Sequence, residues 1–162
     1  MRPDEKIQTS IMATLLLLGI LTAAPIILGD RIVEPFTELG ILGPNMKLGD
    51  YPRTLEVGEQ LNLYLYLGNK EGKLSYYRVD VKHGTQSLNV SDTTPYPGEM
   101  IGRYEKLLLN EENTTIPVSL SLSKPGLNQR IVFELYKHST QSNDFEYDGL
   151  WVQLWVNVTM PR

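Results

Sequence analysis

Two patterns of hydrophobic and polar positions divide this chain of 162 residues. From residue 8 to residue 29 no side chain is ionisable, and four consecutive leucines, Leu15 to Leu18, lie near the middle of the run. From residue 54 onward, apolar and polar residues alternate with a period of two. The first pattern predicts a long apolar helix, and the second predicts a series of half-buried β-strands.

The uncharged run is long enough to cross a membrane. A helix rises about 1.5 Å per residue, so residues 8–29 would span about 33 Å, against a hydrocarbon core of about 30 Å. The alternative is a cleaved signal peptide, whose apolar run is shorter. Cleavage after Ala24 would leave Pro25 as the first mature residue, where its fixed ring fits an extended protease substrate poorly. We therefore expect one uncleaved N-terminal transmembrane helix that partners the lipid bilayer.

Charges beside the run indicate its orientation. Arg2 and Lys6 precede it and Arg31 follows it, while acidic residues count for little in the positive-inside rule. This balance predicts a single-pass protein of the cell membrane. Residues 1–7 would form a cytoplasmic stub, and the domain after the anchor would be extracellular.

The alternating runs predict an all-β domain. Apolar rows at every second position mark the strands of antiparallel sheets with one buried face. The clearest rows lie at 61–67, 77–81, 116–122, 131–135 and 152–158, and shorter candidates lie at Phe36–Leu42, Thr54–Val57, Ser87–Val90 and Tyr104–Leu109. Glycine and proline turn signals separate the runs. Seven to nine short strands favour an immunoglobulin-like antiparallel β-sandwich over residues 54–160, after a linker and first edge strand at 30–53.

Composition narrows the classes of function. The net charge is −4 and no basic stripe is present, so nucleic-acid binding has no electrostatic support. Cysteine is absent, which excludes disulfides, thiolate nucleophiles and cysteine metal sites.

Few residues offer a candidate chemistry. Asp144, Glu146 and Asp148 alternate like the start of an EF-hand loop, but the twelfth position, which needs glutamate, is Trp155. A solvated acidic hairpin is therefore favoured over a weak calcium site. The two histidines, His83 and His138, lack the spacing of a zinc pair or a catalytic triad, and Glu111-Glu112 is best interpreted as a solvated loop. We expect no enzyme activity and no cofactor.

Two surface features remain as candidates for modification or binding. Asn89, Asn113 and Asn157 begin Asn-x-Ser/Thr sequons and are candidate glycosylation sites on an outward-facing domain. Large aromatic residues occupy the polar rows of the strands and would form a sugar- or protein-binding face if they met on one sheet. They are Tyr64, Tyr66, Tyr76, Tyr136, Trp151 and Trp155. The alternative is burial under loops or in the interface between the sheets.

One series of short motifs is distinctive. It runs from Pro35-Phe36-Thr37-Glu38-Leu39 through Leu42-Gly43-Pro44 and Tyr51-Pro52 to Val57-Gly58-Glu59, and it continues with Tyr76-Tyr77, Leu135-Tyr136 and Leu154-Trp155-Val156. Over residues 34–158 the chain resembles an archaeal membrane-protein family known only as domain of unknown function 1616. The resemblance implies a membrane-anchored, outward-facing β domain and supplies no activity. Family members often carry several membrane helices before this part, whereas this chain has room for one.

These observations favour a non-enzymatic function. We expect an extracellular interaction module, or an accessory subunit that binds another membrane or envelope protein. The alternative is a carbohydrate-binding or surface-layer component that uses the aromatic face, with a glycan as its partner.

Overall fold

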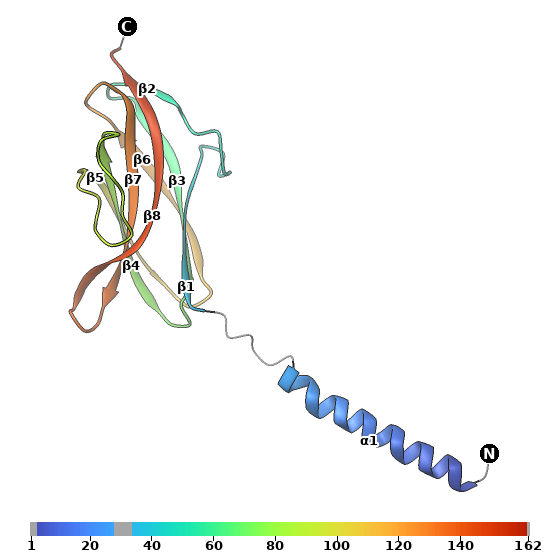
Figure 1. Cartoon of the computed structure of the whole chain (residues 1–162). Helices are drawn as coiled ribbons and strands as arrows, with labels where there is room; N and C mark the ends of the chain where they lie inside the picture. The colour runs from blue at the N-terminus through green and yellow to red at the C-terminus, as the bar shows by residue number, and fades with distance from the viewer. Residues whose placement is uncertain (1–2, 28–33, 162) are drawn as a thin grey trace. The chain divides into compact units, whose positions relative to one another are not determined.

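The computed structural model describes residues 3–27 and 34–161 and contains two compact units, one ending at Glu34 and the other beginning at Pro35 (Figure 1). The first unit carries a single helix, α1 (Pro3–Ile27). The second unit is the β domain. Residues 28 and 29 of the expected anchor and residues 30–33 of the expected linker lie outside the described residues.

The apolar side chains of α1 that the structure describes are exposed on all sides. Leu15, Leu16, Leu17 and Leu18 are each more than half exposed, and four consecutive residues at about 100° per residue encircle a helix. Within the part of the chain that the structure describes, no helix combines the length and mean apolarity required of a membrane span. The expected transmembrane helix is therefore not shown by the structure.

The β domain consists of two sheets. The eight strands among the described residues are β1 (Phe36–Leu42), β2 (Thr54–Glu56), β3 (Gln60–Lys70), β4 (Ser75–Gly84), β5 (Glu99–Leu108), β6 (Asn113–Ser121), β7 (Gly126–Ser139) and β8 (Asp144–Thr159). One sheet has the order β1-β3-β6 and the other the order β2-β8-β7-β4-β5. The chain therefore crosses repeatedly between the two sheets, while the consecutive strands β4 and β5, and β7 and β8, are neighbours within one sheet.

The core lies between the two inner faces. Leu61, Leu63, Leu65 and Leu67 of β3 are at most 1% exposed, and Ile131, Phe133 and Leu135 of β7 are fully buried. These are the apolar rows that the period-two pattern predicted. Burial of such rows, at about 25 cal/mol per Å² of apolar surface, is the main stabilising contribution in a domain without disulfides.

The expected strands differ from the structure in three places. The strand expected at Ser87–Val90 is wrong, because residues 85–90 form turns and irregular structure. The short strand expected at Tyr104–Leu109 is the second half of a longer one, β5. Finally, β2 pairs with β8 in parallel, although all pairs were expected to be antiparallel.

A long loop covers part of the five-stranded sheet. Residues 85–98 join β4 to β5, and we call them the cover loop. Arg130 donates to the Leu88 carbonyl at 2.8 Å, and the Tyr147 hydroxyl donates to the Ser91 carbonyl at 2.6 Å. Burial raises the pKa of Tyr147 to about 12, so its hydroxyl stays a donor at neutral pH. The cover loop is therefore held by side chains of β7 and β8.

Candidate binding site

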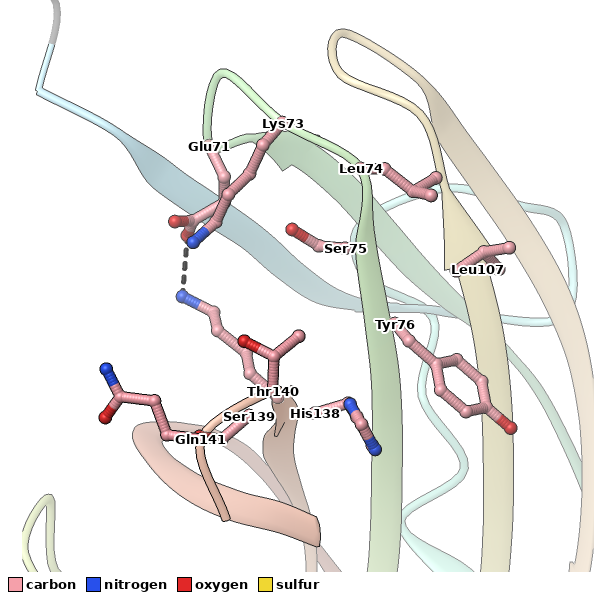
Figure 2. Close-up of a pocket in the computed structure, with 11 residues that line it drawn as sticks. Glu71, Lys73, Leu74, Ser75, Tyr76, Leu107, His138, Ser139, Thr140 and Gln141 are labelled. Atoms are coloured by element: carbon pink, nitrogen blue, oxygen red, sulfur yellow. Dashed lines mark hydrogen bonds and ion pairs between the residues drawn. The ribbon is translucent and has the colours of Figure 1, made fainter. Parts of the chain in front are cut away.

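A pocket of about 580 Å³ lies at the end of the β domain where β1 begins. We call it the tip pocket. The β3–β4 turn forms one wall, β4 and β5 form its floor, and the β7–β8 hairpin forms the opposite wall (Figure 2). Its lining residues are Glu71, Lys73, Leu74, Ser75, Tyr76, Leu107, Lys137, His138, Ser139, Thr140 and Gln141.

A buried amide holds the loops at this end of the domain. Asn69 is fully buried, and its Nδ2 donates to the carbonyls of Lys73, Leu108 and Leu109 at 2.8, 3.0 and 3.0 Å. Its Oδ1 accepts the backbone N–H of Glu71 and the hydroxyl of Tyr77, both at 3.0 Å. One side chain thus satisfies backbone groups of the β3–β4 turn and of the end of β5, which positions one wall of the pocket.

Ion pairs cross from the turn to β7 and β8. Lys137 lies 2.6 Å from Glu71 and 2.8 Å from Asp148, and Thr37 donates to Glu71 at 2.7 Å. Burial by itself raises the pKa of the Glu71 carboxyl, but the hydrogen bonds from Lys137 and Thr37 outweigh it and lower that pKa. Burial lowers the pKa of Lys137, but Asp148 and Glu71 outweigh it and raise that pKa. The pKa shifts of Glu71 and Lys137 therefore both favour the charged forms of this pair.

An aromatic cluster lies beside the pocket on the outer face of the five-stranded sheet. The Phe145 ring centroid lies 5.0 Å from that of Tyr76 and 5.4 Å from that of His138. The Arg78 guanidinium lies 4.6 Å from the centroids of both Phe145 and Tyr136, a distance at which a cation is attracted to a ring face. We call Tyr76, Arg78, His138 and Phe145 the aromatic cluster.

The pocket and the cluster together offer mixed chemistry. Leu74 and Leu107 supply apolar surface, and the ring of Tyr76 stands beside them (Figure 2). Ser75, Thr140 and Gln141 supply hydroxyl and amide groups. Such a surface suits a ligand that has both apolar and hydrogen-bonding groups, such as a peptide segment or a sugar.

The six aromatic residues that the sequence singled out do not share one face. Tyr64 and Tyr66 lie on β3 of the three-stranded sheet, whereas the other four lie on the outer face of the five-stranded sheet. Tyr136 is only 7% exposed, and Trp155 lies under the Arg130 guanidinium at 4.3 Å. Only Tyr76 belongs to the tip pocket.

The three acids of the calcium hypothesis have separate partners. Asp148 pairs with Lys137, Glu146 accepts the Ser142 hydroxyl at 2.6 Å, and Asp144 accepts the N–H of Phe145 at 2.7 Å. Among the residues the structure describes, no three acidic or histidine side chains are grouped so that they could hold a metal ion.

The remaining titratable candidates lie apart from one another. His83 contacts the Gln129 amide and His138 joins the aromatic cluster. Glu111 pairs with Lys70 at 2.5 Å, and Glu112 accepts the Leu109 N–H at 2.8 Å.

The three sequons differ in their surroundings. Asn89 lies exposed in the cover loop, and Asn113 is the exposed first residue of β6. Asn157 is half-buried, and its Oδ1 accepts the N–H of Asn128 at 2.9 Å. Asn89 and Asn113 are therefore the more accessible acceptors.

Sequence reasoning missed a buried ion pair under the cover loop. Glu134 is 1% exposed and lies 2.8 Å from Lys82, and it also accepts the backbone N–H of Tyr96. Lys82 in turn donates to the Tyr96 carbonyl at 2.9 Å. Both charged residues occupy polar positions of alternating strands, which normally face water. The sequence signal for this burial is the length of the segment between β4 and β5, because long loops without secondary structure are uncommon in compact domains and are often functional.

Comparison with known proteins identifies the family. The family model described as Domain of unknown function (DUF1616) matches residues 31–157. The chain belongs to this family. No curated protein matches.

Three solved structures are similar to parts of this chain. The CARDB domain of the PF1109 protein from Pyrococcus furiosus, described in complex with di-metal ions, is 12% identical with a TM-score of 0.50, over 82% of this chain and all of that one. A β-glucosidase from Listeria innocua is 14% identical with a TM-score of 0.45, over 76% of this chain and 16% of that one. An α-2-macroglobulin fragment from Escherichia coli is 14% identical with a TM-score of 0.47, and the match covers 78% of this chain and 17% of that one. The CARDB likeness shows the immunoglobulin-like fold alone.

Proposed function

We propose that this family member is a membrane-anchored, extracellular interaction module without enzyme activity. In this proposal the N-terminal segment, residues 8–29, holds the β domain at the outer surface of the cell membrane. The tip pocket and the aromatic cluster then bind a segment of another membrane or envelope protein. The observation that carries the proposal is the aromatic cluster, which stands half-exposed beside an open pocket at the end of the domain where β1 begins.

Two observations support the proposed membrane anchor: the uncharged sequence of residues 8–29 and the exposure of apolar side chains on α1. The run at 8–29 lacks ionisable groups, and the described apolar side chains of α1 are exposed all round the helix. Helices that are apolar on every side are stable in a protein core or in lipid rather than in water. Alkaline carbonate extraction of membranes from expressing cells tests this step, and release of the chain into the soluble fraction would contradict it.

The anchor step has a matched pair of variants. Leu16→Arg places a charge near the middle of the run, where an arginine costs about 2.5–3.5 kcal/mol for insertion, and it should release much of the chain. Leu16→Ile keeps the apolar character and should stay in the membrane fraction.

The interaction step is tested by recovery of a defined partner. The full chain carrying a photoreactive group at residue 141, on the rim of the tip pocket, should cross-link to one membrane protein in native membranes. The double variant His138→Ala/Phe145→Ala removes two rings of the cluster and should abolish that cross-link, whereas Leu127→Ala, an exposed residue at the start of β7, should leave it unchanged. Repeated recovery of the uncross-linked chain would overturn the proposal.

Carbohydrate binding is the second candidate function. The specific observation in its favour is that Tyr76 lines the same pocket as the hydroxyl and amide residues Ser75, Thr140 and Gln141. The Tyr76 hydroxyl donates to Glu105, which raises the pKa of Tyr76 and fixes the ring direction. Glycan-array binding that Tyr76→Ala abolishes and that Trp155→Ala leaves intact would support this function over the first.

A further inference from the structure

Three exposed leucines form an apolar patch at the end of β4 and β5. Leu74, Leu107 and Leu109 are 54%, 54% and 63% exposed. Leu107 lies opposite Tyr76, and Leu108, opposite Ser75, is fully buried. Because neighbouring side chains of a strand point to opposite faces, Leu107 and Leu109 both point away from the core. We call Leu74, Leu107 and Leu109 the leucine patch.

The patch lies at the end of the sandwich where β1 begins. Phe36, the first residue of β1, lies opposite Lys70 at the end of β3. The neighbouring Asn69 side chain bonds to the Leu108 and Leu109 carbonyls. Figure 1 shows the start of β1, the β3–β4 turn and the β7–β8 hairpin at one end of the domain, and the end of β8 at the other.

The chain is short between this end and α1. Residues 28–35 separate the last residue of α1 from the first residue of β1, which is eight residues (35 − 28 + 1). Eight residues reach at most about 29 Å when fully extended.

We propose that the leucine patch lies against the headgroup region of the bilayer that holds α1, so that the patch is a lipid-contacting surface. The inference rests on the proposed anchoring. Contact with lipid removes the three leucine side chains from water, which favours the arrangement. Lys73, beside Leu74, is exposed, and a lysine ammonium group on its long stem reaches lipid phosphates.

The acidic residues of the neighbouring turn do not oppose this contact. Glu111 pairs with Lys70, and the carboxylate of Glu112 accepts the Leu109 N–H. Both carboxylates therefore have partners within the β domain, which reduces the charge that they present to the headgroups.

The absence of cysteine makes a direct test possible, because one introduced thiol is labelled uniquely. The full chain is reconstituted into phosphatidylcholine vesicles with a fluorescent label on Leu74→Cys, Leu109→Cys or Leu127→Cys. Leu127 is 77% exposed and begins β7, at the opposite end of that strand from the tip pocket. Lipids with a nitroxide near the headgroup should quench the labels at 74 and 109 at least threefold more than the label at 127.

Two further arms separate this inference from the anchoring itself. If alkaline carbonate releases the chain from the vesicles, that result would overturn both the membrane anchoring and the lipid contact of the leucine patch. If the chain stays in the vesicles but the labels at 74, 109 and 127 are quenched equally, that result would overturn only the lipid contact. Adding Leu107→Asp should lower the quenching at 74 and 109 toward that at 127, and unchanged quenching would contradict the role of the patch.

Discussion

At the scale of single residues, buried polar groups decide whether loops stay in place. Asn69 illustrates this, since one amide meets five backbone and side-chain groups at the end of the domain where β1 begins. Leaving a buried polar group without a partner costs about 1–3 kcal/mol. Its surroundings make Asn69 a stability determinant that neither its residue type nor its place in the sequence predicts.

Replacement of Asn69 should therefore be costly. Asn69→Ala removes all five hydrogen bonds and should lower the free energy of unfolding by about 3 kcal/mol. Asn69→Asp should cost at least as much, because a carboxylate would face three carbonyl oxygens. The exposed Asn89→Ala is the control and should change stability by less than about 0.5 kcal/mol.

Urea unfolding of the full chain in detergent, followed by tryptophan fluorescence, measures these changes. Both tryptophans lie on β8, so the signal reports the β domain alone. Equal stability of Asn69→Ala and Asn89→Ala would refute the role given to Asn69.

The buried pair under the cover loop makes a second prediction at this scale. Lys82→Met leaves the Glu134 carboxylate buried without its cation and should destabilise the β domain by about 3–5 kcal/mol. Adding Glu134→Gln to that variant removes the unpaired charge but keeps an acceptor for the Tyr96 N–H, so it should restore part of the loss. The same urea titration checks both variants, and no recovery in the double variant would contradict the assignment.

At the scale of elements, charge pairs fasten the β3–β4 turn to the strands of the five-stranded sheet. Lys137 on β7 links Glu71, in the β3–β4 turn, to Asp148 on β8. The hydroxyl of Thr37, on β1 of the three-stranded sheet, donates a hydrogen bond to Glu71. Four segments therefore meet through two carboxylates, one ammonium group and one hydroxyl.

The lowered pKa of Glu71 gives this link a pH dependence. The folded pKa lies below the usual 4.5, so the unfolded state binds protons first as the pH falls. Stability from Glu71 is therefore complete above about pH 4.5 and is lost as the pH falls through the folded pKa. The pKa of Lys137 is raised, so the stability that Lys137 contributes depends on pH in the opposite direction. That stability is lost only as the pH rises above the usual 10.5.

Lys137→Met should lower stability at pH 7 by about 1 kcal/mol and flatten its dependence on pH between about 5 and 3. Thermal unfolding across this range measures the slope for the wild type and the variant. Parallel curves for the two proteins would show that Glu71 does not draw its stabilisation from Lys137.

At the scale of the whole molecule, accessibility decides which sequons can be modified. Passage of the full chain through the secretory pathway of a glycosylating host should place glycans on Asn89 and Asn113. Asn157 should stay unmodified, because it is half-buried and accepts a backbone hydrogen bond. Intact mass before and after enzymatic glycan removal counts the glycans, and Asn113→Gln should remove one. A chain without glycans would contradict the expected outward orientation.

Local patterning was enough to predict most of the strands and the all-β class of the domain, but not the strand expected at Ser87–Val90 or the parallel pairing of β2 with β8. The alternation of Leu61 to Leu67 places one row of side chains on the same face of β3 whatever the strand neighbours are, because the face follows from the period, and the opposing sheet then buries that row. Phe36–Leu42 matches β1 because turn residues bound an apolar run of strand length. The family was likewise recognisable from short motifs, since these are carried by the sequence itself.

Only the tertiary structure decided which polar positions face water. Glu134 occupies an outward position that normally faces solvent, but the cover loop bonds to it and it is buried. Tyr136 occupies another such position and packs against the Arg78 guanidinium and the Tyr147 ring. The leucine patch and the aromatic cluster arise in the same way, from residues far apart in the chain that the order β8-β7-β4-β5 brings together. Sequence periodicity reports the face on which a side chain lies, whereas its exposure depends on what long-range folding places over that face.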